Sequence, residues 1–162
     1  MAYEFYVTVE GTKQGKFKPE STREARADRL TGLAFRYSIQ SPRDAATGMA
    51  GGKRIHRPIS FVKEWGAASP QFFQALCTNE ILKSVLFEFV SHDPDGLRYV
   101  FHTIKVTNAS VSEIEQYVED EAPGNEAHEA QPLEKISMTF QKIELENKDG
   151  QTTAADDWFG GH

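Results

Sequence analysis

The sequence has little of what marks membrane-bound or disulfide-stabilised proteins. Its 162 residues include a single cysteine, Cys77, so the chain cannot form an internal disulfide. No run approaches the roughly 18 consecutive apolar residues of a membrane-spanning helix, so we expect no direct membrane insertion. The N-terminal residues 1–5 show neither the basic nor the apolar region of a classical signal peptide. We therefore expect folding in the cytoplasm, and any export by a route that reads no N-terminal signal.

The chain also lacks an excess of basic charge. Its 18 Lys and Arg residues face 24 Asp and Glu residues, which gives a net charge of −6. Nucleic acid is therefore disfavoured as the main partner, because neutralising phosphates requires a basic face. With 39% hydrophobic and 26% charged residues the composition is that of a soluble globular protein. The length fits a single domain over residues 1–162.

Motifs for catalysis, nucleotide binding and metal binding are missing as well. Gly51-Gly52-Lys53 looks like part of a phosphate-binding loop, but Arg54 stands where that motif needs Ser or Thr for magnesium. No G-x-S-x-G nucleophile elbow occurs, and the five histidines lack metal-ligand spacing. We expect no catalytic residue, no metal and no cofactor. Of the histidines, His56 is predicted to make a structural hydrogen bond and His102 to be exposed.

What the sequence does contain is alternation of apolar and polar residues, which is typical of strands with one buried face. It predicts strands near residues 3–9, 33–39, 59–61, 85–89, 99–106 and 136–145. The buried parity changes within the last two, which we interpret as β-bulges or strand bends in a curling sheet. The predicted fold class is mainly β: an antiparallel β-barrel of about seven strands with one short flanking α-helix and long extended loops.

One segment has helical periodicity instead. Ser69 followed by Pro70 is typical of a helix N-cap and the first helical residue. Phe72, Phe73 and Leu76 then recur at helical spacing, which predicts a short amphipathic helix packed on the barrel. Cys77 belongs to the same apolar pattern, so it is expected to be a buried structural thiol.

Three long segments lack strand alternation. Residues 41–53 carry three glycines, residues 119–132 are acidic and turn-rich, and the tail 147–162 is polar apart from Trp158-Phe159. That aromatic pair is expected to dock on its own domain or on a neighbour. Long loops in a compact domain are typically functional. Because no catalytic motif accompanies them, contact with another chain is the simplest function for the glycine-bearing loop.

From the glycine-rich loop onward the chain carries a G-K-x-x-x-x-P strand, a K-E turn and an S-P helix start, formed by Gly52, Lys53, Pro58, Lys63, Glu64, Ser69 and Pro70. This order resembles the signature of the haemolysin-coregulated protein (Hcp) family, the tube proteins of bacterial type VI secretion systems. Residues 99–111 and 133–143 are similar to its later strands, so the resemblance covers nearly the whole chain in order. Trp65-Gly66 departs from the Ile-Asp that many relatives carry after the K-E turn.

The resemblance implies a structural subunit and not an enzyme. Family members form a hexameric ring with a central channel, and the rings stack into a tube that a contractile sheath drives outward behind a spike protein. Effector proteins travel in the lumen, and the subunit itself reaches the medium without a cleaved signal peptide. We place the inter-ring contact in the 41–53 loop, because a glycine-bearing loop adapts to a facing surface and charges set the register. The residues expected there are Arg43, Asp44, Met49 and Lys53. A plain mobile loop is the competing interpretation.

Two other functions fit the same residues. One is a monomeric small-ligand-binding β-barrel with an apolar interior and loops at its mouth. The other is a phage-type tail tube protein, which shares the ring architecture. Ring formation separates the first from the tube subunit, and neighbouring genes for a sheath and membrane complex separate the second.

Overall fold

The protein is seen in a computed structural model that describes residues 4–19, 29–118 and 132–158. These residues form twelve strands, all paired antiparallel, and one helix. The elements in chain order are β1 (Glu4–Gly11), β2 (Gly15–Lys16), β3 (Leu30–Gly32), β4 (Ala34–Arg36), β5 (Ile39–Gln40), β6 (Ile55–His56), β7 (Ile59–Glu64), α1 (Ser69–Thr78), β8 (Leu82–His92), β9 (Arg98–Val118), β10 (Pro132–Thr139), β11 (Lys142–Asn147) and β12 (Thr152–Asp157). The predicted mainly β class with one short helix is confirmed.

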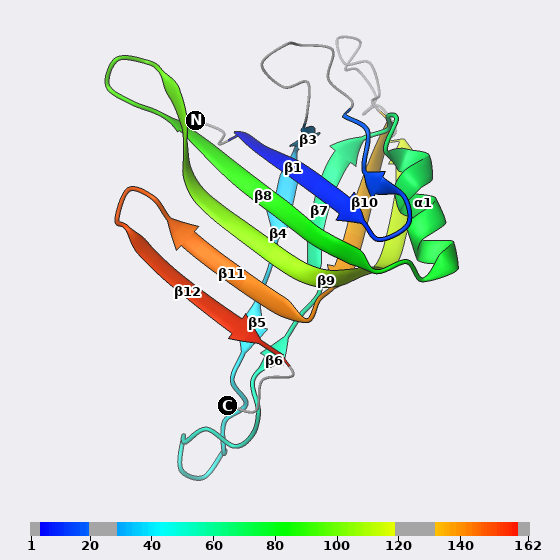
Figure 1. Cartoon of the computed structure of the whole chain (residues 1–162). Coiled ribbons are helices and arrows are strands. Elements are labelled where there is room, and N and C mark those ends of the chain that lie inside the picture. The colour runs from blue at the N-terminus through cyan, green and yellow to red at the C-terminus, as the bar shows by residue number, and fades with distance from the viewer. Residues whose placement is uncertain (1–3, 20–28, 119–131, 159–162) are drawn as a thin grey trace, which may run out of the picture.

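Ten of the strands form a single curled sheet (Figure 1). Its main order is β2-β1-β8-β9-β10-β7-β4, and β11 and β12 continue from β9. The two edges meet at the segment 30–36, because β3 pairs with β1 while β4 pairs with β7. Leu33 lies between these short strands, and its N–H donates to the Val62 carbonyl at 2.8 Å. No continuous strand closes the sheet, but the joined edges give a barrel-like fold.

The strand β9 connects the two halves of the sheet. It is 21 residues long, and its first half pairs with β8 and β11 while its second half pairs with β10. Its register shifts at Phe101, opposite Phe89 and Val90, and again at Ser112. An extra residue bends a strand and increases its twist, which lets one strand serve both halves. The bulge predicted within residues 99–106 is confirmed.

Two predictions about strand continuity are wrong. Residues 136–145 form β10 and β11, which end and begin on either side of Phe140-Gln141, so the parity change there marks two separate strands. Residues 33–39 form β4 and the first residue of β5, and Leu33 and Ile39 are exposed. Phe35 and Tyr37 do pack against the core, but the chain leaves the barrel after β4, so the two ends of the predicted strand do not share that face.

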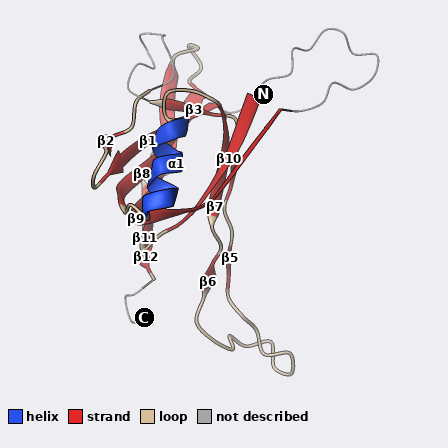
Figure 2. Cartoon of the chain, turned by 90° about the vertical axis from the view of Figure 1, so that its right-hand side faces the viewer, coloured by secondary structure: helices blue, strands red, loops and turns tan. Residues whose placement is uncertain are grey.

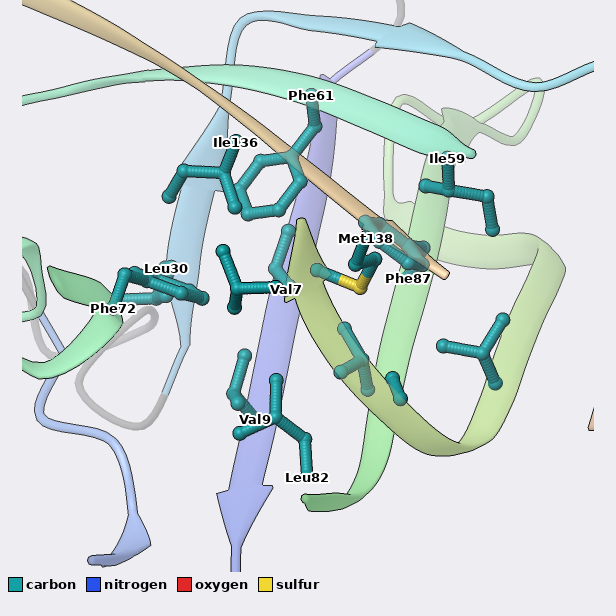
Figure 3. Packing of buried hydrophobic residues seen from close by; sticks show 14 of the residues in the cluster. Val7, Val9, Leu30, Ile59, Phe61, Phe72, Leu82, Phe87, Ile136 and Met138 are labelled. Atoms are coloured by element: carbon teal, nitrogen blue, oxygen red, sulfur yellow. The ribbon is translucent and has the colours of Figure 1, made fainter. Parts of the chain in front are cut away.

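The core lies between the two halves of the sheet and beneath α1 (Figure 3). Phe61 packs between Phe72 of the helix and Phe87 of β8, with ring centroids 6.0 and 5.5 Å away. Val7 and Ile136 are fully buried beside them. Fully burying a side chain of this kind is worth about 1.5–3 kcal/mol, so this shared cluster holds the helix and both halves together.

Three predictions about the helix are wrong in detail. Ala68 is the N-cap, and Ser69 is the first helical residue. Phe72 and Ala75 are buried, whereas Phe73 is 60% exposed and Cys77 is exposed. Residues three and four apart share a helix face, so a helix that buries Phe72 and Ala75 turns Phe73 and Cys77 outward.

Candidate functional site

Residues 39–56 form an arm that projects from the barrel (Figures 1 and 2). At its base β5 pairs with β6, the Arg57 N–H donates to the Ser38 carbonyl at 3.0 Å, and Arg57 Nη2 donates to Gln40 Oε1 at 3.0 Å. At the strand rise of about 3.3 Å per residue, the half-arm from Ile39 to Thr47 spans at most roughly 26 Å. The predicted glycine-bearing loop 41–53 is the outer part of this arm.

The tip of the arm is organised by its own hydrogen bonds. Arg43 forms a β-bridge with Ala50, and the Asp44 N–H donates to the Met49 carbonyl at 2.8 Å. The Gly48 N–H donates back to the Asp44 carbonyl at 2.8 Å, with Gly48 at a φ of +71° that glycine adopts without steric cost. Met49 is 68% exposed. The tip therefore presents a preformed surface with an apolar side chain flanked by opposite charges.

At the base of the arm His56 connects three parts of the chain. It is buried, its Nδ1 lies 2.8 Å from the Tyr37 hydroxyl, and its Nε2 lies 2.6 Å from Asp156 Oδ2. Its ring also packs against Phe140 and Trp158, at centroid distances of 5.4 and 5.1 Å. The prediction that His56 makes a structural hydrogen bond is confirmed.

Two basic residues of the arm bind the C-terminal strand. Arg54 Nε donates to Asp156 Oδ2 at 2.6 Å, and Arg54 Nη2 donates to the Asp157 carbonyl at 3.0 Å. Lys53 Nζ donates to the Trp158 carbonyl at 2.8 Å. Trp158 thus docks on its own domain, while Phe159 lies outside the described residues.

The structure separates the four residues expected at the inter-ring contact. Arg43, Asp44 and Met49 are exposed at the tip, whereas Lys53 binds the C-terminal strand within its own chain. Tyr37 and Asp156 of the arm base were not singled out from the sequence, and Arg54 was noted only as a departure from the phosphate-loop motif. Their common site exists only after β12 has returned beside the arm.

The charges at the arm base have one clear consequence. The hydrogen bond from Arg54, together with His56, holds the pKa of Asp156 below its ordinary value of 3.8, although desolvation opposes this. Partial burial, and the negative charge of Asp156, raise the pKa of Tyr37. Asp156 is therefore ionised at neutral pH and is the anion that holds the arm base to β12.

Two of the family-signature residues, Lys63 and Ser69, meet in a buried polar network. Lys63 and Glu134 are fully buried, with Nζ and Oε1 2.5 Å apart. The Ser69 hydroxyl donates to Glu134 Oε1 at 2.6 Å and accepts from the Gly66 N–H at 3.0 Å. Gln116 Nε2 donates to Glu134 Oε2 at 3.1 Å. Ser69 therefore joins the turn before the helix to β10. The sequence had predicted that this residue caps the helix.

This network explains the spacing of the signature. Lys63 Nζ also donates to the Glu64 carbonyl at 3.0 Å and lies 5.9 Å from the centre of the Phe72 ring. The K-E turn and the S-P helix start are thus two sides of one contact, and Pro70 occupies the first turn of α1. Glu134 was missed, because an acidic residue in a strand is normally solvated.

A second feature is an apolar hollow of about 450 Å³ on the inner face of the sheet. It is lined by the rings of Phe5, Phe35, Phe89 and Phe101 and by Leu33, Ala34, His102 and Ile104. The prediction that His102 is exposed is wrong. The bulge at Phe101 turns His102 to the inner face, where it is half-buried with its ring 6.1 Å from that of Phe89.

Two searches of the described residues gave no site. In residues 4–19, 29–118 and 132–158 no group of three or more His, Cys, Asp or Glu side chains could hold a metal ion. No helix within the same ranges is long and apolar enough to cross a membrane. The acidic segment 119–131 lies outside these ranges, so the prediction for it stays a prediction.

Comparison with known proteins gives the family. Residues 6–146 match the family described as "Type VI secretion system effector, Hcp". The chain belongs to the Hcp family. It is 29% identical over 168 residues to the "Major exported protein" of Pseudomonas aeruginosa PAO1, covering 98% of this chain and 96% of that protein.

Solved structures agree with the family match. The crystal structure of an Hcp protein superposes with a TM-score of 0.90 at 25% identity, over 99% of this chain and 100% of the other. The Hcp1 protein of Escherichia coli EAEC 042, in a doubly substituted form, gives a TM-score of 0.84 at 25% identity, over 98% and 100% of the chains. The resemblance noted from the signature residues is confirmed, and the chain is a type VI secretion system protein.

Breaking the buried ion pair should destabilise this Hcp protein. Lys63→Met leaves the Glu134 carboxylate buried without its cation, which costs about 3–5 kcal/mol in comparable cases. The double variant Lys63→Met/Glu134→Gln removes both charges and should recover much of that loss. Urea unfolding measures both, with Lys135→Met, half-buried on the same strand as Glu134, as the control. A loss below about 1 kcal/mol in the single variant would show that the pair is dispensable.

The Asp156 contact should make stability depend on acid pH. Because folding lowers the pKa of Asp156, its contribution is present above its ordinary value of 3.8 and is lost as the pH falls below it. At pH 7 the urea concentration at the unfolding midpoint should therefore be higher for wild type than for Asp156→Asn. This difference between the two midpoints should shrink below about pH 3.8. Asp95→Asn at an exposed turn is the control. A difference that is constant across this range would rule out Asp156 as the responsible carboxylate.

Proposed function

We propose that this Hcp protein is the subunit of the type VI secretion inner tube, in which hexameric rings stack and carry effector proteins in the lumen. The observation that carries the proposal is the arm. A barrel that worked alone would have no use for a preformed tip held away from its core, with an exposed Met49 and the flanking charges of Arg43 and Asp44. The family match over residues 6–146 supports the same role.

The ordered tip and the anchored base of the arm support its role as the contact between rings. Its tip is ordered by backbone hydrogen bonds, so little ordering entropy is lost when it meets a facing surface. Its base is held by the buried His56 and by Asp156, and these contacts connect the arm to the barrel through β12. A contact made at the tip is thus transmitted to the body of the subunit.

The proposed partners follow from this role. The tube lies inside a contractile sheath and ends in a spike protein, and the subunit leaves the cytoplasm with the tube and not by a cleaved signal peptide. The Pseudomonas relative is named as an exported protein, which supports this route. The role proposed is structural and not enzymatic, in keeping with a family of structural secretion proteins.

The hollow favours one other candidate, a small-ligand-binding barrel. Its volume of about 450 Å³ lies within the range of ligand pockets, roughly 300–1,000 Å³, and its wall is aromatic. Ligand pockets also need a few polar groups that fix the orientation of the ligand, and among the described residues that line this hollow only His102 has a polar side chain. A monomeric mass would favour this candidate. A phage-type tail tube protein is a further alternative, because it would form the same kind of ring.

Light scattering and electron microscopy of the purified protein test the proposal together. Wild type should have about six times the 18.2 kDa mass of the chain and appear as rings with a central hole. Replacing residues 44–51 by a short turn should leave the ring mass unchanged but abolish stacking into tubes, because only the tip is removed. Unchanged tubes would contradict the role of the arm, and a wild-type monomer at all concentrations would contradict the tube subunit itself.

A further inference from the structure

A pocket separate from the hollow lies at one edge of the sheet. The start of β8, the middle of β9 and the turn from β10 to β11 meet at this edge (Figure 1). The pocket has a volume of about 470 Å³, within the range of roughly 300–1,000 Å³ that is typical of small-molecule sites. Among the described residues it is lined by Ile81, Asn108, Thr139, Phe140 and Gln141, none of which is charged.

Asn108 has a left-handed backbone in the middle of a strand. Its φ is +51°, and it lies between Thr107, which pairs with β11, and Ser110, which pairs with β10. Glycine adopts this conformation without steric cost, so the bend by itself does not require an asparagine side chain. That side chain has a partner instead: Asn108 Nδ2 donates to Gln141 Oε1 at 2.8 Å. Non-glycine residues held in this conformation cluster at ligand-binding and active sites.

Gln141 is held on both sides of its backbone. Its N–H donates to the Thr107 carbonyl at 3.1 Å, and its carbonyl accepts from the Trp158 N–H at 2.7 Å. The side-chain amide therefore starts from a fixed position, and the hydrogen bond from Asn108 sets its direction. A group that is positioned before a ligand arrives loses little entropy when the ligand binds.

The two side-chain amides leave one donor and one acceptor available. A single hydrogen bond joins them, and the described part of the chain gives no second partner to Asn108 Oδ1 or Gln141 Nε2. An amide pair joined by one hydrogen bond always keeps one carbonyl oxygen and one NH2 group free. The exposed Thr139 hydroxyl and the Ile81 side chain, which is 43% exposed, line the same pocket. The pocket thus offers an acceptor, a donor, a hydroxyl and an apolar contact without any charge.

We infer that this amide pocket binds a saccharide that carries an acetamido group. An acetamido group is neutral and combines an N–H donor, a carbonyl acceptor and a methyl group. Asn108 Oδ1 accepts the N–H, Gln141 Nε2 donates to the carbonyl, and Ile81 contacts the methyl group. The Thr139 hydroxyl both donates and accepts, which suits the hydroxyl groups of a sugar ring. A charged ligand is disfavoured, because no ion in the pocket offsets its loss of hydration.

Saturation-transfer NMR of the purified protein with tri-N-acetylchitotriose tests the class of ligand. The acetamido methyl protons should receive the strongest saturation, because they lie against Ile81. Cellotriose, which has the same linkage but no acetamido group, is the control ligand and should bind roughly tenfold more weakly. A trimer without signal, or equal affinity for the two sugars, would overturn the inference. Tighter binding of N-acetylalanine amide than of the sugar would assign the pocket to peptides and would also overturn it.

Two substitutions test the amide pair. Gln141→Glu keeps an oxygen for Asn108 Nδ2 but removes the donor, so the affinity for the trimer should fall roughly tenfold. Asn108→Gly keeps the left-handed backbone and removes the amide, and a similar loss is expected. Gln151→Glu, which makes the same charge change at the exposed turn between β11 and β12, is the matched control and should bind like wild type. Urea unfolding checks that each variant folds.

The outcomes separate a binding role from a purely structural one. Loss of binding in both variants, with the unfolding midpoint of Gln141→Glu close to that of wild type, would establish the amide pair as the binding group. Unchanged affinity in Gln141→Glu would show that the pair only supports the bend of β9, and would overturn the inference. The inference goes beyond the proposed function and does not involve the arm, so its failure leaves the tube subunit untouched.

Discussion

The buried ion pair between Lys63 and Glu134 is the interaction on which the arrangement of sheet and helix depends. Removing two charges from water is costly unless each finds a close partner, so the pair forms only when β7 and β10 lie in register and Ser69 reaches Glu134 at 2.6 Å. The turn after β7 and the start of α1 are thereby fixed as well, because Ser69 accepts the Gly66 N–H. One polar contact thus positions the apolar helix face over the core.

A second polar cluster performs a similar task at the opposite end of the chain. Asp156 receives hydrogen bonds from Arg54 and lies 2.6 Å from His56 Nε2, so the C-terminal strand supports the arm through side chains and not through a sheet ladder. The His56 side chain is itself buried and packs against the rings of Phe140 and Trp158. A hydrogen bond made by a buried ring is less open to competition from water, so His56 is the firmest of the contacts that join the arm to the barrel.

Large apolar side chains are exposed at several separate places on this Hcp protein. Met49 lies at the tip of the arm, Phe73 on the outward face of α1 and Leu33 at the wall of the hollow. Single exposed apolar residues are ordinary on protein surfaces, so such a position supports a contact only where a second observation accompanies it, as the hydrogen-bonded tip does for Met49.

The sequence by itself determined the mainly β class, the single helix and the family, because strand alternation, helical spacing and the order of signature residues are local properties of the chain. It also located the arm. Tertiary structure alone decided that Lys63 pairs with Glu134 and His56 with Asp156, since these partners are 71 and 100 residues apart. It alone turned Phe73 and Cys77 outward and His102 inward, because which of two adjacent residues meets the core depends on how a helix or a bulged strand is rotated against its neighbours, and no local pattern records that rotation.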